Sequence, residues 1–402
     1  MFHLEAFISQ YVTKRPSSMF YGDIEENKEA LAKGIAGKSV LVIGGAGSIG
    51  SSFIKALLPF KPGRLVVVDT NENALAELTR DLRSTRGMYV PSDYVPYPMD
   101  FSSPVFEKMF RSRGGFDIVG NFSAHKHVRS EKDIYSVEAL LQNNVLHARQ
   151  LLELLAEYPP EAYFCVSTDK AANPVNIMGA SKRIMEDVIF SYSDRFPVKT
   201  ARFANVAFSN GSLPAGFLAR ISKLQPLSAP SDVRRFFVSP EESGQICLLS
   251  CILGENRVIF FPKLEEAQMM TFDAIGTQLL KAYGYEVLEC ESDAEAIERA
   301  EALKRGSNLY PVHYAASDTS GEKPFEEFVT ETETADYDRF KSLGVITGKA
   351  IPDKTRIEQL FAALTAVFDK EGTAKEEVVS IMKDYLPNFE HIETGKSLDS
   401  KM

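Results

Sequence analysis

The feature of this sequence that most constrains its fold is a series of short, continuous apolar runs separated by helical stretches. The first run ends in a glycine-rich turn that leads into the helical stretch Ser51–Pro59. Six runs have this character: Ser39–Ile43, Arg64–Val68, Phe116–Val119, Tyr163–Val166, Lys199–Phe203 and Val258–Phe261. Continuous apolar runs that alternate with helices are typical of parallel strands buried on both faces. The sequence therefore predicts an α/β fold built on a doubly wound parallel sheet.

The turn after the first run has the spacing of a dinucleotide site. Gly44, Gly47 and Gly50 lie between the expected strand and the expected helix, together with Ser48 and Ile49. Such a site needs a tight turn, a backbone that approaches the pyrophosphate closely, and a helix N-terminus directed at it. A glycine triplet alone is weak, but here the strand, the helix and a second strand that ends in an acid all agree. These five residues are predicted to bind a dinucleotide on a sheet of the Rossmann type.

Asp69 ends the second apolar run and points to the kind of dinucleotide. Its carboxylate is expected to accept hydrogen bonds from an adenosine ribose and to repel a 2′-phosphate. The residues just after it, which include Asn71, contain no Arg or Lys, and this favours NAD over NADP. Asp100 and Phe101 are expected to hold the adenine, with a loop-capping role for Asp100 as the alternative.

The regularity of the pattern divides the chain. Asp23 is expected to cap a helix that runs through Ala36. Four parts are expected: a helical N-terminal arm (1–36), an NAD-binding domain (37–208, with 239–266 returning to it), a smaller substrate-binding lobe (209–238 and 267–350), and C-terminal helices with a tail (351–402). Later helices are expected at Phe272–Tyr283, Asp293–Leu303, Arg356–Phe368 and Lys375–Leu386.

Charge and cysteine content argue against several classes of protein. The net charge is −10 and the pI is about 5.3, whereas nucleic-acid-binding proteins normally show a basic face. The four cysteines form no CxxC pair and have no zinc spacing, and reduced thiols suit the cytoplasm. No signal peptide is recognisable at the N-terminus, and no apolar run approaches the roughly 18 residues of a membrane span. A cytoplasmic protein without a membrane span is expected.

Several further motifs occur together with the glycine turn. They are GSIG at 47–50, KHV at 126–128, STDKAxNP at 167–174, MGASKR at 178–183, RFxNVxxSxGSxxP at 202–214, RRFF at 234–237 and GEKPFEEF at 321–328. In this combination the sequence resembles the extended short-chain dehydrogenase/reductase family. Within that family it is most similar to the UDP-N-acetylglucosamine 4,6-dehydratase branch, which serves bacterial polysaccharide and glycan biosynthesis.

The resemblance implies an elimination that regenerates its own NAD. Lys170 is expected to take the C5 proton of the sugar and Asp169 to protonate the leaving C6 hydroxyl, and the two should titrate as a coupled pair. Lys182 is expected to contact the nicotinamide ribose. Met178 stands where the family usually has a tyrosine, and a thioether cannot take a proton. The proton of the C4 hydroxyl is therefore expected to go to Asp169, Thr168 or a water.

The resemblance also implies which residues contact a UDP-sugar substrate: Lys126, Asn205, Arg235 and Glu322. Arg235 is expected to pair with the diphosphate, because a planar guanidinium suits phosphate oxygens. Phe122 departs from the family pattern and should alter the nicotinamide pocket. Segment 287–320 is longer than usual, and it is expected either to reshape the sugar pocket or to build an oligomer contact. No metal site is expected, because the histidines that flank Lys126 have no third ligand at a clear spacing. Relatives form dimers and larger assemblies, so a homo-oligomer is expected.

Two other functions stay open at this point. One is a nucleotide-sugar epimerase or reductase, which Met178 disfavours because a 4-epimerase relies on the tyrosine at that position. The other is a non-catalytic NAD-binding regulator, which the presence of Asp169, Lys170 and Lys182 disfavours.

Overall fold

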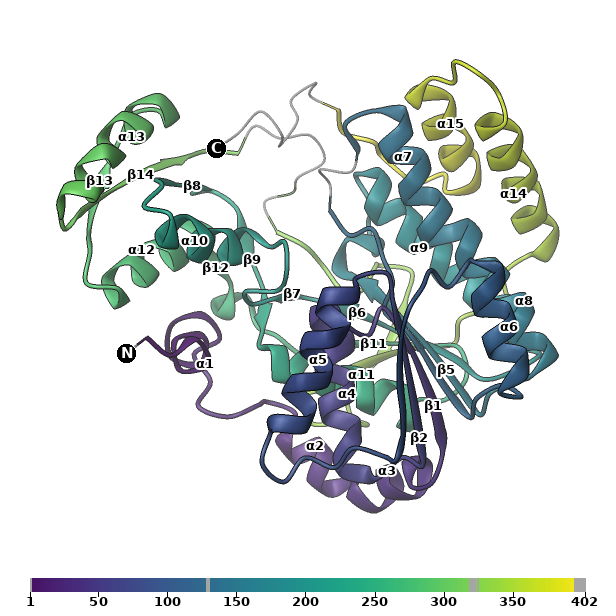
Figure 1. Cartoon of the computed structure of the whole chain (residues 1–402). Helices are drawn as coiled ribbons and strands as arrows, with labels where there is room; N and C mark the ends of the chain where they lie inside the picture. Colours follow the sequence, from purple (N-terminus) through teal and green to yellow (C-terminus); the bar gives the residue numbers. More distant parts are fainter. Residues whose placement is uncertain (1, 128–130, 318–322, 324, 394–402) are drawn as a thin grey trace.

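The six apolar runs all become strands of one central sheet. The structure is a computed structural model that describes residues 2–127, 131–317, 323 and 325–393. The strand order of its nine-stranded sheet is β15-β16-β11-β6-β5-β4-β1-β2-β3. The strands are β1 (Ser39–Ile43), β2 (Arg64–Asp69), β3 (Asp93–Pro98), β4 (Ile118–Asn121), β5 (Ala162–Thr168), β6 (Val198–Phe203), β11 (Val258–Pro262), β15 (Thr334–Asp336) and β16 (Leu343–Thr347). From β3 to β11 all neighbours pair in parallel, which confirms the doubly wound parallel sheet (Figure 1).

Both edges of this sheet differ from the apolar pattern. β3 was not predicted from the sequence, because it contains two prolines and is not a continuous apolar run. It is an edge strand, where proline is tolerated. At the other edge, β16 pairs antiparallel with β11, and β15 pairs antiparallel with β16. The predicted C-terminal boundary of the small lobe, residue 350, was therefore wrong, because the strands at 334–336 and 343–347 belong to the main sheet. The physical reason is that this pairing covers backbone groups that β11 would otherwise expose.

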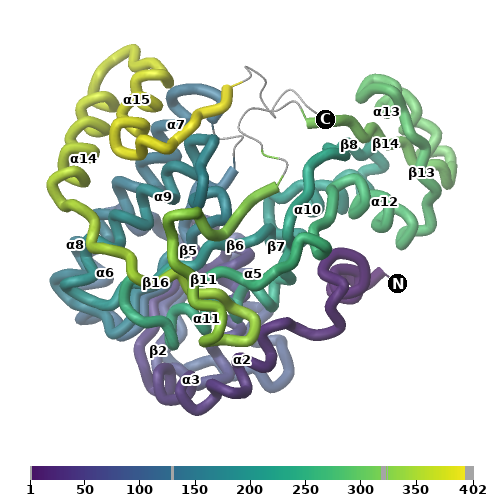
Figure 2. Tube along the Cα trace, turned by 180° about the vertical axis from the view of Figure 1, so that it is seen from behind, coloured from purple at the N-terminus to yellow at the C-terminus, as the bar shows by residue number. Residues whose placement is uncertain are grey.

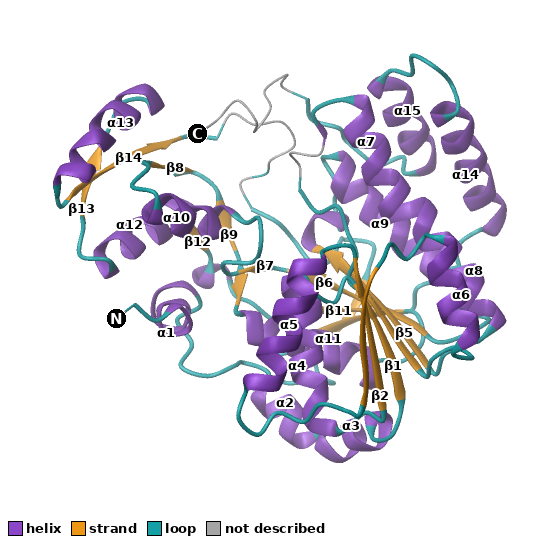
Figure 3. Cartoon of the chain, in the orientation of Figure 1, coloured by secondary structure: helices purple, strands orange, loops and turns teal. Residues whose placement is uncertain are grey.

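Helices cover both faces of the sheet (Figure 3). One face carries α4 (Ser48–Leu57), α5 (Glu72–Ser84) and α11 (Pro240–Leu253), and the other carries α6 (Pro104–Ser112), α7 (Ile134–Leu141), α8 (His147–Glu157) and α9 (Ile177–Phe190). α4 begins within the glycine turn, so that turn lies at the carboxyl end of β1. Among the described residues, no helix combines the length and the apolar character that crossing a membrane would require.

A small lobe with its own apolar core stands beside the main sheet (Figure 1). It consists of α10 (Leu213–Ser222), β8 (Leu227–Pro230), α12 (Phe272–Ala282), β13 (Glu286–Glu289), α13 (Asp293–Arg299) and β14 (Leu309–Ala315). Its strands form a parallel sheet in the order β13-β14-β8. Two short ladders lie between this lobe and the main sheet: β7 (Asn205–Val206) pairs with β10 (Phe237–Val238), and β9 (Arg234–Arg235) pairs with β12 (Met270–Thr271).

The N-terminal arm is helical but consists of short pieces: α1 (Leu4–Phe7), the π-helix Ile8–Val12, α2 (Tyr21–Glu26) and α3 (Lys28–Ile35). Asp23 was expected to cap a helix, but it lies inside α2, where its buried carboxylate accepts hydrogen bonds from the N–H groups of Lys341 and Ser342. Phe7 belongs to the core of the small lobe and Leu31 to the core of the main sheet. The arm thus ties the two parts of the chain together.

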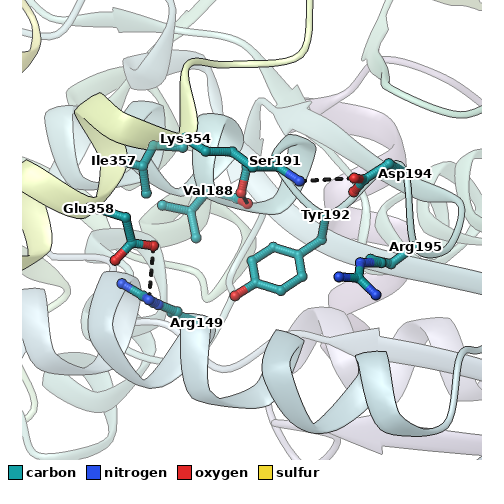
Figure 4. A pocket seen from close by; sticks show the side chains of 9 residues that line it. All are labelled: Arg149, Val188, Ser191, Tyr192, Asp194, Arg195, Lys354, Ile357 and Glu358. Carbon is teal, nitrogen blue, oxygen red and sulfur yellow. Dashed lines mark hydrogen bonds and ion pairs between the residues drawn. The ribbon is translucent and has the colours of Figure 1, made fainter.

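Two C-terminal helices, α14 (Lys354–Phe368) and α15 (Lys375–Tyr385), confirm the elements expected there. They pack against the helical layer that contains α8 and α9, as Figure 2 shows from behind. A cleft of about 170 Å³ lies at this contact. Ion pairs cross it between Arg149 and Glu358 and between Lys354 and Asp194, each at 2.9 Å (Figure 4).

The contact between α4 and α11 generates a test of the fold. A Cβ on Gly244 of α11 would lie 2.2 Å from the carbonyl oxygen of Ser52 in α4. Gly244→Ala should therefore force the two helices apart and lower the free energy of unfolding by ~1–3 kcal/mol, as measured by denaturant titration.

Gly216→Ala in α10 is the matched control, because a Cβ there would meet nothing within 4 Å. That substitution should leave stability unchanged or raise it by up to ~1 kcal/mol through helix propensity. Equal stabilities for the two variants would contradict the packing described here.

Candidate functional site

A cleft of about 760 Å³ lies between the carboxyl ends of the central strands and the small lobe. The main domain and the short ladders contribute most of the residues predicted for the site: Gly44, Gly47, Ser48, Ile49, Gly50, Phe122, Lys126, Thr168, Asp169, Lys170, Met178, Lys182 and Asn205. The small lobe supplies the opposite wall from β8, α12, α13 and β14. Residues far apart in the sequence therefore meet in one cavity large enough for small-molecule ligands.

The glycine turn forms one end of this cleft with its backbone open. Gly44 has a φ of 69°, and a Cβ on it would lie 2.6 Å from the backbone nitrogen of Ser123. A Cβ on Gly50 would lie 2.4 Å from the carbonyl oxygen of Gly44. Gly47 is the N-cap of α4, and no side chain caps that helix. The first-turn N–H groups of α4 are thus available to an anion, and the turn fits the diphosphate of a dinucleotide.

Asp69 lies beside this turn rather than on the wall of the cleft. Its carboxylate accepts hydrogen bonds from the N–H groups of Ala46 (3.0 Å) and Asn71 (2.9 Å). The Asn71 side chain caps α5, the exposed Asp100 carboxylate accepts from the backbone and hydroxyl of Ser102, and Phe101 is buried. The structure thus gives Asn71 and Asp100 local structural contacts, and their role toward a cofactor stays a prediction.

Helix α9 presents Met178 and Lys182 to the cleft one turn apart. Met178 is buried, and Lys182 donates a hydrogen bond from Nζ to the carbonyl oxygen of Val166 at 3.1 Å. Burial lowers the pKa of Lys182. Phe122 packs against Phe53, with ring centroids 5.0 Å apart, and lines the cleft as well.

Glu131 anchors the start of α9, and sequence reasoning missed it. Its buried carboxylate accepts hydrogen bonds from the N–H groups of Ile177 (3.0 Å) and Met178 (2.8 Å). An acidic group at a helix N-terminus satisfies otherwise unpaired donors and complements the helix dipole. Because Glu131 is 46 residues away from Ile177, no local signal reveals this contact.

Asp169 and Lys170 stand in a 3₁₀ turn directly after β5. Lys170 Nζ lies 3.3 Å from Asp169 Oδ1, and the hydroxyl of Thr168 donates to the same oxygen at 2.8 Å. A second carboxylate, that of Glu326, lies 3.5 Å from Lys170 Nζ. Burial alone would lower the pKa of Lys170, but Asp169 and Glu326 outweigh it and hold that pKa above its usual value, although Arg235 opposes them. In this state the lysine is protonated and the pair is an ion pair.

Two predicted substrate residues line the cleft. Lys126 is exposed at its edge, and Asn144 fixes the preceding residue by hydrogen-bonding both the N–H and the C=O of His125, each at 2.9 Å. Asn205 follows β6, and its Nδ2 is buried without a hydrogen-bond partner within the described residues. A donor held in this way at a cavity wall suits a polar ligand.

Arg235, which is expected to pair with the diphosphate, contacts backbone carbonyl groups and a carboxylate in this structure. Arg235 is buried, and its Nη1 donates to the carbonyl oxygens of Arg234 and Lys323 at 2.9 Å each. Its Nη2 lies 3.9 Å from Glu326, so its guanidinium belongs to the carboxylate cluster around Lys170 and does not line the cleft. Glu322 lies outside the described residues.

The small lobe adds residues that no motif indicates. His313 Nδ1 lies 2.6 Å from Asp293 Oδ1, and both side chains line the cleft. They belong to segment 287–320, for which a role in this pocket was one of two expected roles. Their pairing depends on the fold of α13 and β14 and has no sequence signal of its own.

One buried ion cluster joins the elements that surround the site. Arg202 of β6 is fully buried and contacts Glu186 of α9 at 2.8 Å and Glu333 at 2.6 Å. Ser167 of β5 also donates to Glu186, at 2.7 Å. Burial would raise the pKa of Glu333, but the Arg202 guanidinium outweighs it and brings that pKa to about 2. These contacts hold β5, β6, α9 and the segment that contains Glu333 in one fixed arrangement.

The capping contact of Glu131 leads to a test of the site. Glu131→Ala should fray the first turn of α9, because two buried N–H groups lose their acceptor, and the free energy of unfolding should fall by ~1–2 kcal/mol. Hydrogen–deuterium exchange at Ile177 and Met178 should accelerate. The control Glu138→Ala, on α7, should leave exchange at these amides unchanged, and the same exchange in both variants would rule out the cap.

Comparisons with known proteins show which family this chain resembles in sequence. A family model described as "Polysaccharide biosynthesis protein" matches residues 40–347. An uncharacterized membrane protein of Methanocaldococcus jannaschii is 27% identical over 86% of this chain and 96% of its own length. A UDP-N-acetylglucosamine 4,6-dehydratase (inverting) of Campylobacter jejuni is 27% identical over 57% of this chain and 67% of its own length.

The fold also has a solved counterpart. A dTDP-glucose 4,6-dehydratase, DesIV of Streptomyces venezuelae, solved with NAD and TYD bound, superposes with a TM-score of 0.54 at 19% identity, over 72% of this chain and 88% of that one. Two longer relatives, also named for polysaccharide biosynthesis, are matched over only 40% and 42% of their length. Because the family match runs from β1 to the end of β16, the chain belongs to the polysaccharide biosynthesis protein family.

Proposed function

We propose that this protein removes water from a UDP-N-acetylhexosamine, with UDP-N-acetylglucosamine as the first candidate, and forms a 4-keto-6-deoxy sugar with NAD as its cofactor. The observation that carries the proposal is the meeting of Asp169, Lys170, Met178 and Lys182 in one cleft with the open glycine turn. The Campylobacter relative, named for this reaction, supports the substrate class.

The cofactor would be held by the glycine turn and by Lys182. Gly44 and Gly50 leave room for a diphosphate, and Asp69 lies beside the turn, where it favours an unphosphorylated adenosine ribose. NAD would take a hydride from C4 of the sugar and return it to C6. The NAD bound in the solved dehydratase of the same fold supports this choice.

Acid–base chemistry falls to the Asp169–Lys170 pair. Lys170 as an amine takes the C5 proton, and Asp169 as a carboxylic acid gives its proton to the C6 hydroxyl, which leaves as water. Before the step, one proton must move from the ammonium to the carboxylate, which lie 3.3 Å apart. The pair carries no net charge in either arrangement, so the move adds no uncompensated charge to a buried site.

Met178 separates this reaction from epimerisation. Its side chain lines the cleft at the position where the family usually has a tyrosine, and it cannot take a proton. Asp169 already carries the proton that it gives to the C6 hydroxyl, and the hydroxyl of Thr168 donates to Asp169 at 2.8 Å, so the proton of the C4 hydroxyl goes to water. Water also supplies the proton that C5 regains when the hydride returns to C6, and Lys170 and Asp169 end the turnover as the ion pair in which they began.

Turnover in D2O tests the proposed function. Purified protein with NAD and UDP-N-acetylglucosamine should give a 4-keto product that carries deuterium at C5, detected by NMR and mass spectrometry. Unchanged sugar with every UDP- or GDP-linked candidate would refute the proposal, and a C4 epimer without loss of water would show an epimerase instead.

Lys170→Ala is the variant that links this reaction to the assigned base. It should abolish turnover, while NAD affinity measured by calorimetry stays at the wild-type value, because Lys170 is not among the residues proposed to hold the cofactor. Turnover near the wild-type rate would show that another group removes the C5 proton.

Met178 provides a separate test of its non-acidic role. Met178→Leu conserves volume and should keep kcat within about tenfold of wild type, because such swaps cost less than ~1.5 kcal/mol. Met178→Ala should lower stability by ~2–5 kcal/mol through the cavity it leaves. A loss of kcat by several orders of magnitude in the leucine variant, at unchanged stability, would assign chemistry to the sulfur.

A further inference from the structure

A third carboxylate contacts the acid–base pair. Glu326 lies 3.5 Å from Lys170 Nζ and 3.9 Å from Arg235 Nη2, and its side chain is only 3% exposed. Its Oε1 makes no hydrogen bond among the described residues. A buried carboxylate oxygen without such a bond is costly, so its position beside Lys170 calls for an explanation in the chemistry of that lysine.

The segment around Glu326 is fixed on both sides. Phe328 stacks on Phe261 with ring centroids 5.9 Å apart, and its carbonyl oxygen accepts a hydrogen bond from the buried Arg202 at 2.8 Å. On the other side, Arg235 donates to the carbonyl oxygen of Lys323 at 2.9 Å. These anchors leave the Glu326 side chain little freedom to turn away from Lys170.

We propose that Glu326 is a positioning residue for the dehydration, one that holds the amino group of Lys170 in place and sets the affinity of that group for a proton. The inference rests on the proposed function, because it concerns the base of that reaction. Glu326 acts through Lys170 and does not itself line the cleft.

The charges that face Glu326 show how it acts. Lys170 and Asp169 approach from the turn after β5, Arg235 approaches from β9, and Lys323 belongs to the same segment as Glu326. Burial raises the pKa of Glu326, and the cations around it only partly reverse this. When Glu326 is ionised it favours the ammonium form of Lys170, and when it is neutral it favours the amine that can remove a proton.

The sign of the effect follows from this arrangement. Glu326 is one of two carboxylates that raise the pKa of Lys170. Glu326→Gln keeps the shape and removes the charge, so the pKa of Lys170 should fall. The amine then forms at lower pH, and the rising limb of kcat against pH should move down by about one pH unit. The plateau of kcat should fall at least about tenfold, because the amino group is held less firmly, with KM nearly unchanged.

Glu327→Gln is the matched control. Glu327 is the next residue and has the same side chain, but it is exposed and bonds Asn173 at 3.0 Å. Its pH profile should superimpose on that of the wild type. If the rising limb of kcat against pH in Glu326→Gln also coincides with that of the wild type, the inference is overturned, even if kcat falls. A purely structural role would lower kcat without moving this limb along the pH axis.

A second measurement separates this inference from the proposed function. In the holoprotein without substrate, a small acylating reagent reports the amine form of Lys170, and mass spectrometry reads the labelled peptide as a function of pH. The midpoint should fall by about one pH unit in Glu326→Gln and stay in place in Glu327→Gln. If the labelling midpoint of Lys170 is the same in Glu326→Gln and in the wild type, the inference is overturned, whether or not the protein dehydrates a UDP-sugar. A moved midpoint in a protein that dehydrates no UDP-sugar supports the coupling and refutes the dehydration.

Glu326→Asp keeps the test decisive if the glutamine variant does not fold. This substitution retains the negative charge, but because aspartate is one methylene group shorter, its carboxylate lies farther from Lys170 Nζ. The midpoint for Lys170 labelling should then lie between the values of the wild type and of a variant without the charge. A midpoint equal to the wild-type value together with wild-type kcat would show that the distance to Lys170 has no importance.

Discussion

The ion cluster around Arg202 is the interaction on which the arrangement of the site depends. Arg202 is fully buried and contacts Glu186 and Glu333, while Ser167 adds a hydrogen bond to Glu186. The cluster therefore joins β5, β6, α9 and the segment that carries Glu326. Removing one partner from such a cluster leaves an uncompensated buried charge, which typically costs ~3–5 kcal/mol. Each side chain proposed for the chemistry lies on one of these four elements or directly after one.

The cleft itself depends on how the two parts of the chain are held together. The N-terminal arm buries Phe7 in the core of the small lobe and Leu31 in the core of the main sheet. Between them, Arg15 forms a 2.6 Å ion pair with Glu242 at the start of α11. The Phe7 and Leu31 side chains are both buried within this chain. The role of the arm in the structure is to connect the two walls of the site.

The proposed chemistry follows from a balance of charges in a partly buried cluster. Two carboxylates, Asp169 and Glu326, face Lys170 and Arg235, and the lysine is protonated in this arrangement. Elimination requires the proton on the carboxylate and the amine free. Because Lys170 lies 3.3 Å from Asp169, a single proton shift between them produces that state without a change in total charge. Met178 adds no titratable group to this balance.

The sequence alone determined the parallel sheet, the glycine turn and the placement of Asp169, Lys170, Met178 and Lys182, because apolar runs and short motifs are local signals. It did not determine β15 and β16, whose place is set by pairing with β11. Nor did it show that Glu131 caps α9 or that Glu326 and Arg235 meet at Lys170. These contacts join residues tens to more than a hundred positions apart. Spacing along a chain carries no information about such distances, and only the packing of the tertiary structure decides them.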